Sequence, residues 1–320
     1  MPDESTLLDI LAEIFAVNVP EGDLYIGDDC AVVGSMDGKV VVSCDHFIEG
    51  VHFDRSFASD FEVGFKSSVT AISDIAAMGC LPRFLLIGLA TPTGTGLEEV
   101  FRGIKSAADH YGVVVVGGDM SSTGPSSQVL SISTTVIGTD QLTPAYLTGF
   151  GGDQVPEPVT RSGARPGDWI FVTGTLGGSC AGLRALRDHA RLGEPTALER
   201  KYLYPVARIA QGVLARLCGA RAMIDISDGF SCDLNKVCAR SQVGFELSNV
   251  PCEPGASLED ALGGGGDYEL VFTAPYRDLI ELAFADKGLD LYCVGRCIDS
   301  PGGRFTDGTP VVPRGHSHKF

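Results

Sequence analysis

Two spacings of apolar residues recur along this chain, and together they indicate a mixture of strands and helices. Short apolar runs at residues 39–45 (KVVVSCD) and 83–90 (RFLLIGLA) are bounded by turn-forming or charged residues, which is typical of buried strands. Further strands are predicted at 112–118, 128–139, 168–174, 222–226, 268–274 and 291–297. Strands therefore occur in both halves of the chain.

The longest predicted helix covers residues 60–79. Its apolar side chains recur at spacings of four, three and four residues, which places them in one stripe along a single face. The stripe consists of Phe65, Val69, Ile72 and Ala76. Asp74 lies off this stripe. Other helices are predicted after a cap at Ser5 or Thr6 and at 97–110, 179–190, 205–218 and 229–240.

Residues 140–160 separate two such sets of elements and are rich in Pro and Gly, which predicts a connection between domains. We therefore expect two α/β domains, one over residues 1–150 and one over residues 151–320. A chain of 320 residues that is 44% hydrophobic has enough apolar surface for two cores.

The charge balance limits the possible partners. The 24 basic and 41 acidic residues give a net charge of −17, which repels the phosphate backbone of nucleic acids. The chain has no block of Lys and Arg, so no nucleic-acid partner is expected. No apolar run approaches the roughly 20 residues that a membrane-spanning helix needs, so no membrane partner is expected either.

The ten cysteines show neither a disulfide framework nor the spacing of zinc ligands. Most lie in apolar surroundings, which favours reduced thiols and a cytoplasmic protein. The amino terminus, MPDESTLL, is acidic and has no basic segment before an apolar one, so no signal peptide is expected there.

Common nucleotide-binding and metalloprotease motifs are missing, which disfavours a P-loop enzyme and a dinucleotide-binding dehydrogenase. The chain instead has aspartates at the ends of apolar segments, namely Asp28, Asp29, Asp45, Asp74, Asp119, Asp225 and Asp228. Any single one is better interpreted as a turn former or helix cap. As a set, they favour Mg²⁺ ions bound beside a polyphosphate, because magnesium prefers carboxylate oxygens.

Eight short motifs, in order along nearly the whole chain, resemble those of thiamine-monophosphate kinases. They are 27–31 (GDDCA), 49–53 (EGVHF), 73–79 (SDIAAMG), 117–119 (GGD), 160–168 (TRSGARPGD), 172–177 (VTGTLG), 225–229 (DISDG) and 267–270 (DYEL). Each motif is weak alone, and their shared order carries the resemblance.

The resemblance implies a two-domain α/β (α+β) fold of the aminoimidazole ribonucleotide synthetase-like superfamily. Its amino-terminal domain pairs across a homodimer into a β-barrel, its carboxy-terminal domain is α/β, and ATP lies in a long cleft. The implied reaction transfers the γ-phosphoryl group of ATP to the phosphate of thiamine monophosphate, with several Mg²⁺ ions. No general base is expected, because the accepting phosphate oxygen is already anionic at neutral pH.

The resemblance also implies residue roles. The implied magnesium ligands are Asp29, Ser43, Cys44, Asp45, Asp74, Asp119, Asp225 and Asp228. The implied ATP contacts are Gly118, Asp119, Arg161 and Ser227. The implied substrate positions are His52, Gly266 and His316. Cys44 replaces a threonine of the family, and a thiol is a poor ligand for magnesium, but the family uses the backbone there in part, so the departure is mild.

Three departures concern the substrate side. Gly266 stands where the family has a glutamate, His316 stands where it has an aromatic residue, and the connection from Thr139 to Thr160 is longer than usual. The glycine run at 263–266 is interpreted as a tight loop near the second substrate rather than a phosphate loop. Two alternatives stay open, a related phosphotransferase with another acceptor and a nucleotide-binding paralogue without catalysis.

Overall fold

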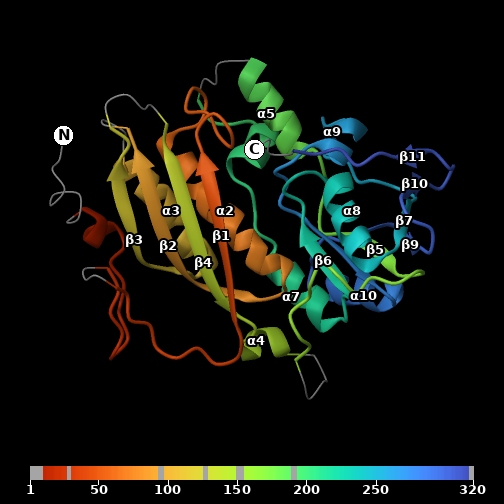
Figure 1. Cartoon of the computed structure of the whole chain (residues 1–320), viewed down its shortest axis with the longest axis horizontal. Coiled ribbons are helices and arrows are strands. Elements are labelled where there is room, and N and C mark those ends of the chain that lie inside the picture. Colours follow the sequence, from red (N-terminus) through yellow and green to blue (C-terminus); the bar gives the residue numbers. More distant parts are fainter. Residues whose placement is uncertain are drawn as a thin grey trace. The chain divides into compact units, whose positions relative to one another are not determined.

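The computed structural model describes residues 10–26, 30–92, 97–124, 129–148, 155–188 and 193–316. The chain forms two compact units (Figure 1). Unit 1 comprises Met1–Ile75 and Pro82–Gln141, and unit 2 comprises Ala76–Leu81 and Leu142–Phe320. The expected α/β class is confirmed. The boundary expected between residues 150 and 151 lies outside the described residues and stays a prediction.

Unit 1 contains a four-stranded sheet, and Figure 1 shows its two long helices on the same side of that sheet. In sheet order, the strands are β1 (Val40–Ile48), β4 (Ser131–Thr139), β2 (Leu81–Thr91) and β3 (Val114–Ser122). The helices are α2 (Asp60–Ala77) and α3 (Leu97–Tyr111). β1 pairs with β4 antiparallel and β2 with β3 parallel, so β1 and β3 are the two edges of an open sheet.

Helix α2 is enclosed on nearly all sides. The predicted stripe is buried at Val69, Ile72 and Ala76, but serines on other faces of the helix are buried as well. The reason is close packing against α3, where a side chain at Gly64 would overlap the backbone of Val100. A one-sided stripe therefore underestimates the burial of this helix.

Unit 2 contains a seven-stranded sheet. In sheet order its strands are β11 (Pro310–Val311), β10 (Gly303–Phe305), β7 (Gly244–Leu247), β9 (Tyr292–Ile298), β5 (Trp169–Val172), β8 (Leu270–Ala274) and β6 (Ala222–Asp225). Its helices are α4 (Pro144–Leu147), α5 (Gly178–Asp188), α6 (Ala197–Leu203), α7 (Ile209–Leu217), α8 (Phe230–Ser241), α9 (Leu258–Gly263) and α10 (Arg277–Asp286).

Both faces of the central strands of unit 2 are buried. On β5, Ile170 and Val172 pack in the core cluster that includes Phe230 of α8. Phe171 points to the opposite face and stacks on Phe272, with ring centroids 5.2 Å apart. Alternate residues of one strand thus contribute to two cores, as the period of a strand requires.

The sequence did not predict several short elements, namely α4, α6, α9, α10, β7, β10 and β11. Helices α6 and α9 each begin at a capping box, formed by Thr196 with Glu199 and by Ser257 with Asp260. Ser/Thr followed three residues later by an acidic residue is a recognisable start signal. No helix of the described residues is long and apolar enough to span a membrane.

A buried arginine fixes residues 76–81 in unit 2. The Arg216 side chain lies on α7 and is 2% exposed. Its Nε donates to the Pro156 carbonyl at 2.7 Å, and its Nη1 donates to the Gly79 carbonyl at 3.0 Å. Gly79 follows the end of α2 and has a φ of 65°, the left-handed conformation that commonly ends a helix. Arg216 therefore joins the backbone at this helix end to the backbone near residue 156.

An Arg216→Met change is expected to lower the free energy of unfolding by about 1–3 kcal/mol, because it leaves the buried carbonyl group of Gly79 without this donor. The measurement is chemical denaturation followed by circular dichroism. Arg187→Met, at an exposed arginine of α5, is the matched control and is expected to cost little. Equal stability of the two variants would contradict this role for Arg216.

Candidate functional site

In unit 1, the carboxylates of Asp45 and Asp74 come together from β1 and α2. Ser43, two residues before Asp45 on the strand, donates its hydroxyl to the Asp74 carboxylate. Thr70, one helical turn before Asp74, hydrogen-bonds to Asp45. Residues two apart on a strand share a face, and residues four apart on a helix do too. Facing surfaces of strand and helix therefore bring these oxygens together.

This arrangement changes the electrostatics of Asp45. Burial, and to a smaller extent repulsion from Asp74, raise the pKa of Asp45 to about 6, although the hydrogen bond with Thr70 opposes the shift. The fold thus holds two like charges close together at a partly buried position. A cation relieves such repulsion, and oxygen donors of this kind suit Mg²⁺.

Cys44 lies on the other face of β1 from Ser43 and Asp45. Its side chain is exposed, and its sulfur accepts a hydrogen bond from Thr135 of β4 at 3.3 Å. The structure therefore does not bring the Cys44 side chain to the two carboxylates. The period of the strand already required this outcome.

His52 follows β1 in a turn, where its ring stacks on Phe47 with centroids 5.6 Å apart. The backbone N–H of Ile48 donates to Nδ1 of His52 at 3.0 Å. With Nδ1 accepting, the neutral ring carries its proton on Nε2, and Nε2 becomes the donor. The same loop is braced by Glu49, which accepts from the backbone of Leu130 at 3.0 Å.

The remaining predicted residues of unit 1 are not brought to Asp45. Gly118 and Asp119 are exposed on edge strand β3, opposite β1 in the sheet order. Three strand spacings separate the two edges, about 14 Å. Asp29 lies outside the described residues.

In unit 2, a set of backbone hydrogen bonds joins the turn at residues 225–229 to two distant segments. The Gly266 N–H donates to the Ser227 carbonyl at 2.8 Å, and the His316 N–H donates to the Asp228 carbonyl at 2.9 Å. Predicted metal and ATP residues thus adjoin predicted substrate residues here. Asp225 is the buried last residue of β6.

Gly266 has a backbone that favours glycine. Its φ is 84°, and a Cβ placed on it would lie 2.8 Å from the hydroxyl of Ser179. Two residues later, Tyr268 has a φ of 52°, which is uncommon for a residue with a side chain. A glutamate at position 266 would therefore be strained on this backbone.

Sequence reasoning did not assign roles to Asp267 and Glu269, which join two motifs about 90 residues apart in the sequence. Asp267 accepts from the backbone N–H groups of Gly177 and Ser179, at 2.6 and 3.0 Å, where α5 begins. Burial raises the pKa of Asp267 to about 6, and these two hydrogen bonds oppose the shift. The carboxylate therefore holds the start of a helix.

Glu269 is buried and accepts from Thr173 Oγ1 and Arg208 Nε, each at 2.7 Å. Arg161 is exposed within residues 155–165 of unit 2. Asp228 has Lys236 as a neighbour, with 2.5 Å between the carboxylate oxygen and Nζ. The carboxylates of Asp228, Asp267 and Glu269 in unit 2 therefore all have N–H or cationic partners.

Comparisons with known proteins place both units in one family. The model of the AIR synthase related protein, N-terminal domain, matches residues 27–139. The model of the corresponding C-terminal domain matches residues 165–308. The two matches together cover most of the chain, and they agree with the two-domain α/β fold described above.

Curated and solved relatives are more specific. The chain is 33% identical to the thiamine-monophosphate kinase of Methanospirillum hungatei, over 99% of this chain and 100% of that protein. It is 30% identical to the crystal structure of thiamine-monophosphate kinase from Stenotrophomonas maltophilia, with a TM-score of 0.79 over 95% of this chain and 96% of that one.

AaThiL complexed with AMPPCP and TMP is 33% identical, with a TM-score of 0.73 over 98% of this chain and 96% of that one. The expected resemblance is thus confirmed over nearly the full length. This chain belongs to the thiamine-monophosphate kinase family, within the AIR synthase related proteins.

Proposed function

We propose that this protein transfers the γ-phosphoryl group of ATP to the phosphate of thiamine monophosphate, giving thiamine diphosphate and ADP. The observation that carries the proposal is the pair of carboxylates on β1 and α2, Asp45 and Asp74, in a chain that matches this family over nearly its full length. A solved relative holds an ATP analogue and TMP, which supports both substrates.

Magnesium suits the unit 1 carboxylates. Asp45, Asp74 and the hydroxyl of Ser43 offer hard oxygen donors, and the raised pKa of Asp45 marks a place where positive charge is favoured. When bound, Mg²⁺ neutralises phosphate charge so that two anionic groups can approach. The chain's own residues hold the donors in place, since Thr70 and Ser43 orient the two carboxylates.

The residues proposed to contact the two substrates bind and orient them. His52, as a neutral ring with its proton on Nε2, suits a hydrogen bond to a phosphate oxygen. For ATP we propose Gly118, Asp119, Arg161 and Ser227. Arg161 suits bidentate binding of phosphate. No residue needs to remove a proton from the acceptor, because the phosphate is already ionised.

A homodimer would complete the unit 1 site. Asp45 and Asp119 lie on opposite edge strands of one sheet. If two copies pair β1 of one with β3 of the other, Asp119 of a second copy approaches Asp45. The exposed face of β1 supports such a partner, because Val40 and Val42 are 55% and 58% exposed. We also propose a cytoplasmic location, which ten free thiols favour.

The acceptor decides between the proposal and its alternatives. Purified protein with Mg·ATP and thiamine monophosphate is expected to give thiamine diphosphate and ADP in equal amounts, measured by chromatography. Formation of ADP only with another phosphate acceptor would favour a related phosphotransferase. Binding of ATP without turnover on any acceptor would favour a non-catalytic paralogue.

An Asp45→Asn change is expected to lower the activity while it raises the stability of the fold. Loss of one anionic donor is expected to lower kcat about 100-fold or more. The same change removes the repulsion with Asp74, so the thermal unfolding midpoint in metal-free buffer is expected to rise. Asp109→Asn, at an exposed aspartate that pairs with Lys105, is the control. A fall in both activity and midpoint would instead indicate a structural defect.

Gly266 tests whether the substrate pocket has changed. Gly266→Glu alone is expected to destabilise the fold by about 1–2 kcal/mol, because the backbone there is left-handed. The Ser179→Ala/Gly266→Glu double variant removes the overlap with the Ser179 hydroxyl, which has no hydrogen-bond partner among the described residues. Ser179→Ala alone is the control.

If the pocket keeps the family's substrate contacts, the KM for thiamine monophosphate falls in the double variant relative to Ser179→Ala. An unchanged or higher KM would indicate that the pocket around Gly266 has been rebuilt.

A further inference from the structure

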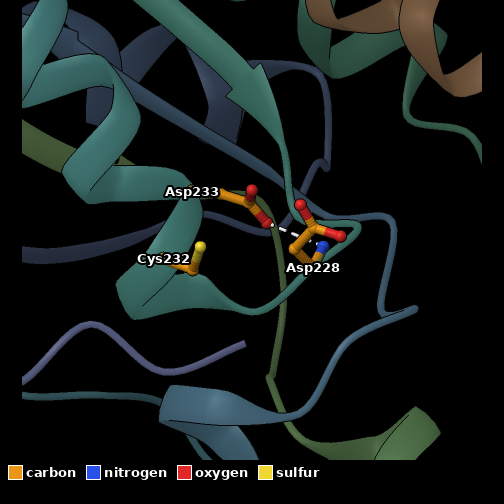
Figure 2. Close-up of side chains that lie close together, drawn as sticks. All are labelled: Asp228, Cys232 and Asp233. Carbon is orange, nitrogen blue, oxygen red and sulfur yellow. Dashed lines mark hydrogen bonds between the residues drawn. The ribbon is translucent and has the colours of Figure 1, made fainter. Parts of the chain in front are cut away.

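The start of α8 gathers two carboxylates and a thiol. Figure 2 shows the side chains of Asp228, Cys232 and Asp233 beside the turn that follows β6. Their donor atoms all lie within 4.8 Å of one another, a separation that a metal ion can bridge. The family resemblance implies that Asp228 binds magnesium. By its donors alone, this cluster is a candidate cation site.

A cation of the protein itself already occupies the position between the two carboxylates. Lys236 Nζ lies 2.5 Å from Oδ2 of Asp228 and 2.6 Å from Oδ1 of Asp233. The other oxygen of Asp233 accepts the backbone N–H groups of Asp228 and Gly229, each at 3.0 Å. Both oxygens of Asp233 and one of Asp228 are therefore engaged.

The buried carboxylate of Asp233 depends on the positive charge of Lys236. The Asp233 side chain is fully buried, whereas that of Lys236 is 37% exposed. A buried carboxylate needs a cation or several N–H donors to stay charged. Lys236 lies three residues after Asp233 on the same helix, which places the ammonium group over the carboxylate. Helix α8 thus carries the counter-ion for its own first turn.

We propose that Lys236 is a resident cation that neutralises Asp228 and Asp233 in place of a metal ion, so that the Asp228 carboxylate does not bind magnesium in this protein. Lys236 is then a positioning residue. It holds Asp228, whose carbonyl accepts from His316 and whose neighbour Ser227 accepts from Gly266. The turn therefore keeps its place beside the substrate residues without a metal ion at Asp228. This inference rests on the proposed function for its link to the reaction.

Direct counting of bound Mn²⁺ tests the proposal without relying on turnover. The metal-free full chain is titrated with Mn²⁺ and followed by electron paramagnetic resonance, in the absence of nucleotide. Asp228→Asn is expected to bind as many Mn²⁺ ions as the unaltered chain. Lys236→Ala is expected to bind one more, because it leaves the cluster of Asp228, Cys232 and Asp233 without a cation. Asp228→Asn/Lys236→Ala is expected to lose that extra ion.

Loss of an ion in Asp228→Asn, or no gain in a folded Lys236→Ala, would overturn the proposal. Lys236→Arg keeps the charge and is expected to keep the original count. If Lys236→Ala fails to fold, the Asp228→Asn count still decides the question. If the Mn²⁺ counts are as expected but the protein is inactive, the proposed reaction is rejected and the role of Lys236 stands. If the protein is active but the counts differ from those expected, the role of Lys236 is rejected and the proposed reaction stands.

Discussion

Repulsion between like charges is the constraint on which the arrangement of unit 1 depends. Asp45 and Asp74 repel each other at close range, so the fold has to hold them together against their own electrostatics. The enclosed helix α2 provides this rigidity, because its close packing against α3 at Gly64 leaves little freedom to move. The hydroxyl groups of Ser43 and Thr70 hydrogen-bond to these two carboxylates and help to orient them.

In unit 2, three carboxylates of the family motifs have partners within the protein. Asp267 faces the N–H groups at the start of α5, Glu269 faces Arg208, and Asp228 faces Lys236. Each carboxylate is thereby neutralised or hydrogen-bonded within the protein itself. Several acidic residues of the family motifs in unit 2 thus have a local structural task. A conspicuous aspartate in a motif is therefore not always a ligand.

The sequence predicted the long elements and the family well, because apolar periodicity and the order of motifs are local signals. It also contained the answer for Cys44, since a residue between Ser43 and Asp45 on a strand must point the other way. It could not place Asp267 against Gly177, because nothing in the spacing of two motifs about 90 residues apart says that they touch. The left-handed backbone at Gly266 was equally hidden, since glycine is compatible with many conformations. Short elements such as β7 and β10 lacked enough residues to show a period.

The buried contact of Arg216 with Gly79 has a consequence for modularity. Six residues of unit 2, Ala76–Leu81, lie in the chain between the two segments of unit 1. No single cut in the polypeptide can therefore release unit 2 whole. A fragment that begins at Leu142 would keep the guanidinium group of Arg216 but lose its acceptor at Gly79. Recombination that exchanges one half of such a chain for that of a relative would have to preserve this contact across the junction.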